Sequence, residues 1–369
     1  MIVLKAAQEK LLAALQSVTG VVERRHTMPI LANVLLRKDG AQVEFTGSDV
    51  EIQIRTTAEL GGDADSLATT VNARKLLDIL RTLPPEQVVT LSSSGNKMLL
   101  QGGKSRYTLQ TMPAEDFPLV KEAEEYGPQF SVPQKTLRQL LSQVHFAMAV
   151  HDIRYYLNGI LFIAEGRSLT LVATDGHRLA LAQQALESDV PIRQEVILPR
   201  KTVLELHRLL ADADDPIEMR FAGNQARFVF SGLEFVTKLV EGKFPDFNRV
   251  IPRHHPNIVE ASRPALLASL QRAAILTSEK FKGVRVNFDP GSMRIAANNA
   301  EQEDALEELE IDYDGPSIET GYNVTYLIDA LASISEPTVR IALNDGNASA
   351  LITVPGRDGF KYVVMPMRI

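Results

Sequence analysis

The sequence predicts an α+β fold built from three tandem homologous domains. One pattern of helices and hairpin turns recurs three times along the 369 residues. The shortest interval between corresponding positions is 123 residues, from Gly223 to Gly346. The longest is 129 residues, from Leu137 to Leu266. Such intervals match the size of whole domains and exceed the size of solenoid repeats.

Each copy begins with a helix that carries two leucines four positions apart, which places both on one helix face. These pairs are Leu11/Leu15, Leu137/Leu141 and Leu266/Leu270. The hairpin turns that follow are Asp39-Gly40, Glu165-Gly166 and Asp289-Pro290-Gly291. A second apolar helix contains, in turn, Leu77, Val203 and Leu327, and the closing hairpins turn at Gly95-Asn96, Gly223-Asn224 and Gly346-Asn347. We therefore expect helices at about 8–18, 73–82, 133–144, 199–211, 262–273 and 323–334.

The segments between these helices alternate apolar and polar residues with the period of two that is typical of strands, as in 51–55 and 88–91. Each domain is then either one four-stranded sheet with two helices on one face, or two such sheets joined edge to edge. Proline-containing linkers at 116–128 and 243–256 separate the copies. They predict domains at 1–127, 128–255 and 256–369.

Composition restricts the class of protein. The chain is 45 % hydrophobic and 23 % charged, so each domain has enough apolar content for a core. The absence of cysteine excludes disulfides and thiolate metal sites and suits a reducing cytoplasm. We expect neither a signal peptide nor a membrane span, because no apolar run is long enough.

The charge is unevenly distributed along the chain. The net charge of −7 by itself argues against a nucleic-acid partner. The six expected helices, however, hold eleven basic and four acidic residues, which gives them +7 and leaves −14 for the rest. Lysine and arginine are good helix formers, but so is glutamate, which is nearly absent from these helices. We therefore predict a shared helix face that meets a polyanion.

Several sequence blocks carry a family resemblance. These are 154–159 (RYYLNG), 173–179 (ATDGHRL), 243–247 (KFPDF), 297–303 with its Ala-Asn-Asn and Glu-Gln-Glu, and 363–368 (VVMPMR). In this order they resemble the bacterial β sliding clamps, the processivity subunits of DNA polymerase III. The resemblance implies two helices and two four-stranded antiparallel sheets per domain. It also implies a head-to-tail homodimeric ring whose hole is lined by helices.

The resemblance further implies function. The protein would be a DNA sliding clamp that encircles duplex DNA without sequence preference, needs no cofactor or metal, and tethers the replicative polymerase for processive synthesis. Its partners would be duplex DNA, the catalytic subunit of DNA polymerase III, the clamp loader, and other replication and repair proteins. Phosphate contacts suit a sliding ring because they carry no sequence information. By resemblance, they fall on Arg25, Arg74, Lys104, Arg106, His151, Arg200 and Lys201.

Two protein interfaces are also implied by the resemblance. A peptide groove between the second and third domains would comprise Tyr156, Leu157, Thr174, Gly176, His177, Arg178, Leu179, Pro245, Arg249, Val250, Val363, Met365, Pro366, Met367 and Arg368. The apolar, methionine-containing terminus agrees with a surface that accepts several partners. A dimer seam would comprise Tyr107 and Leu109 against Ile275 and Leu276, flanked by Lys75, Glu301, Glu303 and Asp304.

Two rival functions are weaker. The fragment Asp175-Gly176-His177 could belong to a hydrolase, but no nucleophile elbow, Walker loop or Rossmann pattern occurs. We therefore expect no enzyme and no catalytic residues. The alternative reading is a peptide-binding scaffold that does not bind DNA.

Overall fold

The computed structural model describes residues 1–23 and 27–368. The described chain divides into two compact units, one containing 1–135 with 204–239 and the other 136–203 with 240–369. The division passes through the middle repeat. One half of its strands belongs to each unit.

The first repeat contains helices α1 (Gln8–Thr19) and α2 (Ala73–Arg81). Its strands are β1 (Ile2–Ala7), β2 (Asn33–Asp39), β3 (Gln42–Ser48), β4 (Ile52–Glu59), β5 (Leu67–Asn72), β6 (Val88–Ser94), β7 (Lys97–Gly102) and β8 (Ser105–Pro113), with 3-10 turns η1 (Pro29–Ala32) and η2 (Ala114–Asp116).

The second repeat contains helices α3 (Gln134–Val144) and α4 (Arg200–Leu209). Its strands are β9 (Phe130–Pro133), β10 (Gly159–Glu165), β11 (Ser168–Thr174), β12 (Arg178–Ala185), β13 (Gln194–Pro199), β14 (Pro216–Phe221), β15 (Gln225–Phe230) and β16 (Leu233–Lys238), with η3 (His145–Ala147), η4 (Tyr155–Leu157) and η5 (Phe247–Arg249).

The third repeat contains helices α5 (Arg263–Ala274) and α6 (Val324–Ala332). Its strands are β17 (Asn257–Ser262), β18 (Gly283–Asp289), β19 (Ser292–Asn298), β20 (Asp304–Glu310), β21 (Ile318–Asn323), β22 (Thr338–Leu343), β23 (Ala350–Val354) and β24 (Arg357–Val364).

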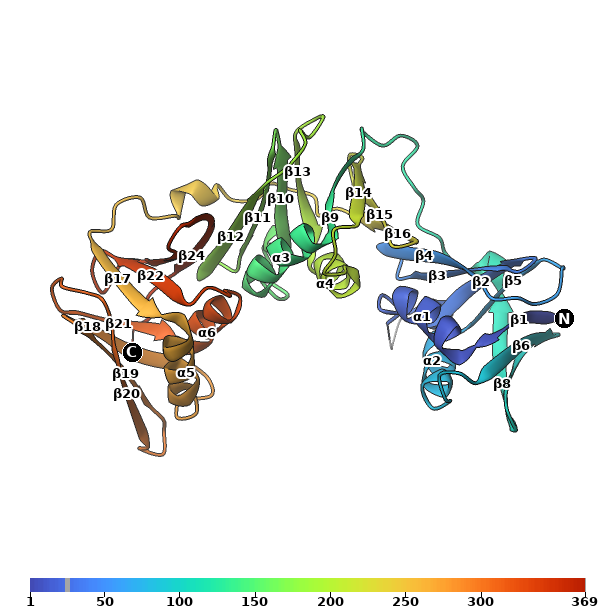
Figure 1. The fold of residues 1–369 in the computed structure, drawn as a ribbon, viewed down its shortest axis with the longest axis horizontal. Coiled ribbons are helices and arrows are strands. Elements are labelled where there is room, and N and C mark those ends of the chain that lie inside the picture. The colour runs from blue at the N-terminus through green and yellow to red at the C-terminus, as the bar shows by residue number, and fades with distance from the viewer. Residues whose placement is uncertain (24–26, 369) are drawn as a thin grey trace. The chain divides into compact units, whose positions relative to one another are not determined.

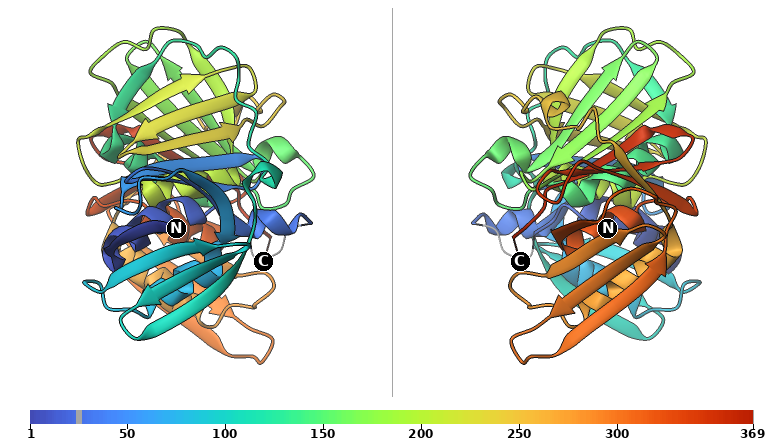
Figure 2. Two further views of the ribbon diagram at one scale, coloured as in Figure 1. Left: turned by 90° about the vertical axis from the view of Figure 1, so that its right-hand side faces the viewer. Right: turned by 90° about the vertical axis from the view of Figure 1, so that its left-hand side faces the viewer.

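The strands of every repeat form two sets of four, as the α+β prediction with paired four-stranded sheets requires. Some of these sets join edge to edge into larger sheets, and one set forms a sheet of its own. In the first unit the order is β1-β6-β7-β8-β5-β2-β3-β4-β16-β15-β14-β9. In the second unit one sheet is β13-β10-β11-β12-β24-β23-β22-β17 and the other is β20-β19-β18-β21 (Figure 2, right, orange).

Local signals explain why the helices begin where they do. The side chains of Asn72 and Asn323 occupy the same repeat position, and each accepts a hydrogen bond from the first turn of its helix, α2 or α6. Ser262 caps α5 in the same way. Such caps satisfy backbone N–H groups that have no partner inside the helix. The predicted helices are therefore confirmed, with ends that differ by at most two residues.

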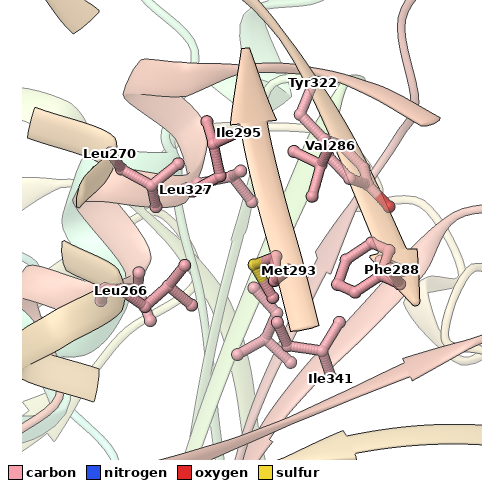
Figure 3. Close-up of a pocket in the computed structure, with 12 residues that line it drawn as sticks. Leu266, Leu270, Val286, Phe288, Met293, Ile295, Tyr322, Leu327 and Ile341 are labelled. Carbon is pink, nitrogen blue, oxygen red and sulfur yellow. The ribbon is translucent and has the colours of Figure 1, made fainter. Parts of the chain in front are cut away.

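Apolar helix faces build the core. Helix α2 buries Leu76, Leu77 and Leu80. It lies beside α1 (Figure 1), with α2 against strands β2 and β5 and α1 against β3 and β4. In the third repeat, α5 and α6 pack against each other and against both sheets. They enclose an apolar cavity of about 20 Å³, which Figure 3 shows. Tyr322 lines this cavity, and burial raises the pKa of Tyr322 to about 12.

Candidate functional site

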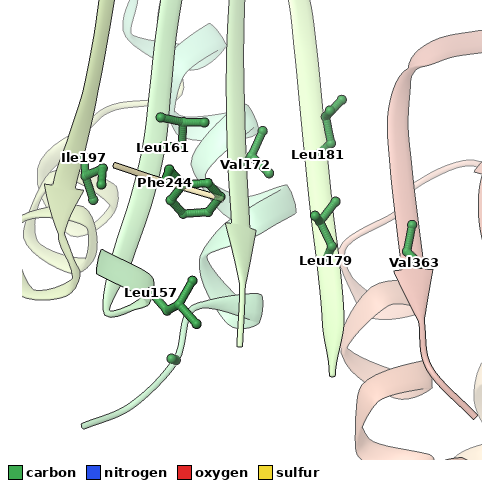
Figure 4. Close-up of a cluster of buried hydrophobic side chains, with 9 residues drawn as sticks. Leu157, Leu161, Val172, Leu179, Leu181, Ile197, Phe244 and Val363 are labelled. Carbon is green, nitrogen blue, oxygen red and sulfur yellow. The ribbon is translucent and has the colours of Figure 1, made fainter. Parts of the chain in front are cut away.

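A groove with a cavity of about 180 Å³ lies within the second unit. Its lining residues are Arg154, Leu157, Thr174, Gly176, His177, Arg178, Leu179, Phe244, Pro245, Phe247, Val250, Val363 and Met365. Leu157, Leu179 and Val363 are buried and continue into an apolar cluster beneath the groove (Figure 4). The groove thus has a firm apolar floor, which suits the burial of an apolar side chain.

Strand pairing positions this floor. Strands β12 and β24 pair antiparallel, and Leu179 lies directly opposite Val363 although 184 positions separate them in the chain. Phe244 is also buried in this cluster, beside Leu161 of β10 and Val172 of β11 (Figure 4). The second repeat, through β12, and the third repeat, through β24, therefore each supply one strand of the groove floor.

The β11–β12 turn forms one end of the groove. The Asp175 carboxylate accepts hydrogen bonds from the backbone N–H groups of His177 (2.9 Å) and Arg178 (3.1 Å). The Thr174 hydroxyl donates to the Arg178 carbonyl over 2.6 Å. Gly176 has φ +91°, and a Cβ there would lie 3.0 Å from the Arg154 guanidinium. Glycine at this position therefore lets the guanidinium lie against the turn.

Arg154 is paired with a neighbouring carboxylate. Its Nε and Nη2 donate to the two oxygens of Asp152, at 3.0 and 2.9 Å. These hydrogen bonds lower the pKa of Asp152 to about 2. The pair leaves the arginine charge compensated at the groove wall.

Arg178 extends behind the wall. Its side chain is 9 % exposed and its Nη1 donates to Asp329 of α6 over 2.6 Å. Nη2 donates to the Phe146 carbonyl (2.6 Å), Nε to Asp175 (3.2 Å), and the guanidinium lies 4.3 Å from the centre of the Tyr326 ring. Burial acts to lower the pKa of Arg178, but Tyr362 and the two carboxylates outweigh it and the pKa is raised. Arg178 is therefore a charged link between the second and third repeats.

The C-terminal tail closes another side. The Met365 N–H donates to the His177 carbonyl over 3.0 Å, which extends the β12–β24 ladder by one bond. The Met367 N–H donates to the Gly321 carbonyl over 2.8 Å. The tail is thus held by backbone bonds, and the Met365 side chain remains 43 % exposed at the groove.

The structure gathers most of the predicted groove residues around one cavity. Tyr156 instead packs against the cluster below it, and four other predicted residues do not line it: Arg249, Pro366, Met367 and Arg368. The sequence reasoning missed Arg154, Phe244 and Phe247. The two phenylalanines were detectable, because aromatic residues in a proline-containing linker require a burial site.

A polar cavity of about 880 Å³ lies within the first unit, between α1, α2 and α4. Arg74, Lys75, Arg81 and Arg208 line it, together with Glu23, Asp78 and Glu205 among other residues. Arg74 and Lys75 are exposed in the first turn of α2, where the helix dipole disfavours cations. This placement favours a role in binding an anion.

Comparison with known proteins identifies the family. Models of the N-terminal, central and C-terminal domains of the DNA polymerase III beta subunit match residues 2–121, 131–246 and 248–368. The chain belongs to the β sliding clamp family. It is 44 % identical to the beta sliding clamp of Pseudomonas aeruginosa over 367 residues and 40 % identical to that of Escherichia coli K12 over 362, with 98 % of each chain covered.

Solved clamp structures show the same fold. A crystal structure of the Pseudomonas aeruginosa sliding clamp has a TM-score of 0.93 at 42 % identity, with both chains fully covered. Another, bound to griselimycin, has a TM-score of 0.93 at 43 % identity. In the described part of this chain, no helix is long and apolar enough to cross a membrane.

The predicted DNA contacts of this clamp differ in exposure. Arg74, Lys104, Arg106 and His151 are exposed, whereas Arg200 and Lys201 in the first turn of α4 are half-buried. Within the described part of the chain, the buried Arg200 Nη1 atom has no hydrogen-bond partner. Burial, followed by the charge of Arg178, lowers the pKa of Arg200. The remaining predicted contact, Arg25, lies outside the described residues.

The predicted clamp seam lies at strand edges. Residues 105–110 of β8 pair with β7 on one side, while β5 pairs only with 111–113, so an edge of β8 is open within the described chain. Strand β20 ends the four-stranded sheet. Unpaired edges are templates for pairing with another chain.

Exposed side chains accompany these edges. Ile275 is 77 % exposed, whereas Leu109 is already buried in its own sheet and Tyr107 and Leu276 are half-buried. The flanking residues Lys75, Glu301, Glu303 and Asp304 are exposed. Two further apolar side chains of the third repeat are exposed, Phe281 at 58 % and Leu306 at 66 %.

Proposed function

We propose that the protein encircles duplex DNA as a head-to-tail homodimer and tethers partner proteins through the groove described above. The observation that supports this proposal is the apolar groove at the junction of β12 with β24, whose lining includes most of the residues expected for a partner site. A groove of this size accepts one or two apolar side chains, each contributing about 1.5–3 kcal/mol when fully buried. Such anchors with backbone hydrogen bonds give micromolar affinity, which corresponds to about −8 kcal/mol.

The basic helix surfaces support a DNA partner. Exposed Arg74 and Lys75 sit at a polar cavity too large and too open to serve as core. Long cationic side chains attract phosphates without reading bases, which a sliding ring requires. We assign the partners as the catalytic subunit of DNA polymerase III, the clamp loader, and other replication and repair proteins, acting in the cytoplasm. The protein itself has no catalytic role.

The homodimer would join open sheet edges. In this proposal β8 of one chain pairs with the β20 side of its partner, where Ile275 is exposed. Two identical contacts of this heterologous kind close a ring by rotation. The domains of each chain would be 1–127, 128–255 and 256–369.

Retention on circular DNA tests the proposal. The protein is loaded by its clamp loader onto a nicked circle, and half of the sample is then linearised by a restriction enzyme. We expect retention on the circle and loss from the linear form, because a ring slides off free ends. Equal retention on both forms would contradict encirclement, and peptide binding without retention on either would favour the DNA-independent scaffold.

A further inference from the structure

Two arginines, Arg154 and Arg178, are among the described residues that line the groove, and each is paired with an aspartate. We propose that Asp329, which lies outside the groove on α6, keeps it neutral and thereby makes it select uncharged apolar anchors over acidic ones. The inference rests on the proposed peptide-binding function of the groove. It adds a specificity-determining residue supplied by the third repeat.

The hydrogen bonds of Arg178 define the role of Asp329. Three nitrogens of the guanidinium donate to Asp175, Asp329 and the Phe146 carbonyl, and the shorter of the two carboxylate contacts, 2.6 Å, goes to Asp329. The Tyr326 and Phe146 rings lie 4.3 and 5.5 Å from the guanidinium carbon. The charged end of a groove-lining residue is therefore held by the protein's own groups.

A second arginine, Arg200, lies near Arg178, whose charge lowers the pKa of Arg200 after burial. Among the described residues, the buried Arg200 Nη1 atom has no hydrogen-bond partner. Asp175 and Asp329 both pair with Arg178, so two arginines and two aspartates lie in this part of the unit. Neutralising Asp329 leaves one uncompensated positive charge directly behind the groove.

The same balance explains how the groove would reject an acidic anchor. A peptide carboxylate entering the apolar cavity loses water and needs a cation in return. Arg154 is already paired with Asp152, and Arg178 with Asp175 and Asp329. An aliphatic or aromatic anchor has no such requirement and gains from burial.

Asp329→Asn tests the inference with little change in shape. The amide oxygen still accepts from Arg178, and the side chain is 30 % exposed, so the variant is expected to fold. The probes are the C-terminal ten residues of the polymerase catalytic subunit from the same organism and a peptide in which one apolar anchor is replaced by Glu. Calorimetry measures both dissociation constants for each protein.

We expect the ratio of the two dissociation constants to fall about tenfold in Asp329→Asn, equivalent to about 1.4 kcal/mol. Asp329→Glu keeps the charge and should keep the wild-type ratio. Asp289→Asn removes a paired aspartate of the same repeat that does not line the groove, and it should also leave the ratio unchanged. Asp329→Ser is a second neutral variant should Asn perturb folding.

An unchanged ratio in both neutral variants, with parent-peptide binding intact, would overturn the role of Asp329 and leave the proposed function standing. An equal loss of affinity for both peptides would show that Asp329 has only a structural role, and would also overturn its proposed role in specificity. A wild-type protein that binds neither peptide would overturn the proposed groove function itself.

Discussion

The C-terminal tail provides the sharpest test of the groove, because its backbone and side-chain contributions can be separated. Truncation after Val364 removes the N–H groups of Met365 and Met367, which donate to the carbonyls of His177 and Gly321. A net contribution of about 0.5–1.5 kcal/mol per hydrogen bond gives a loss of roughly 1–3 kcal/mol in unfolding free energy. Met365→Ala keeps both N–H groups, so it should leave stability nearly unchanged.

Peptide affinity should respond differently from stability. The Met365 side chain lines the groove and is partly exposed there, so a bound peptide would bury it further. Its removal should cost about 1–2 kcal/mol, a five- to thirtyfold loss of affinity. The truncated chain should bind at least as weakly as Met365→Ala.

Calorimetry with the polymerase C-terminal peptide and thermal unfolding together form the assay. We expect Met365→Ala to bind the peptide more weakly at an unchanged melting temperature. The truncated chain should melt a few degrees lower and bind the peptide more than fivefold more weakly. Ile192→Ala, which changes an exposed apolar residue that does not line the groove, is the matched control. Unchanged peptide affinity in the truncated chain would refute the placement of the groove.

Three further predictions follow from the other surfaces. Arg74→Ala should flatten the slope of log K against log salt by about 0.9 for unloaded duplex binding, equally for two unrelated sequences measured by fluorescence anisotropy; a marked sequence preference would contradict sliding. Ile275→Asp should give folded monomers by sedimentation, because the seam would bury an unpaired charge, and dimers persisting at micromolar concentration would rule out this seam. The pKa of Glu234 is lowered because hydrogen bonds from Arg55 and Arg227 outweigh its burial. Its stabilising contribution is complete above about pH 4.5 and is lost as the pH falls through the lowered pKa, so Glu234→Gln should lose less melting temperature than wild type between pH 5 and 3; parallel losses would exclude this role.

Much of the fold follows from local patterns in the sequence. The hairpin turns at Gly40 and Gly166 have positive φ, as glycine turns require, and the strands on either side pair as expected. The helix starts after Asn72 and Asn323 are fixed by side-chain caps within three residues. These features depend on neighbouring residues only, so a single sequence reveals them.

The sequence by itself determined the threefold repeat, the helix positions and the excess of positive charge on the helices. Only the tertiary structure decided how the strands of adjacent repeats join, that Arg200 is half-buried, and that Phe244 completes the groove floor. The ion pair between Arg178 and Asp329 joins residues 151 positions apart. Such contacts depend on the register of β12 against β24 and on the packing of α6 near that junction, and no local period or turn signal specifies either.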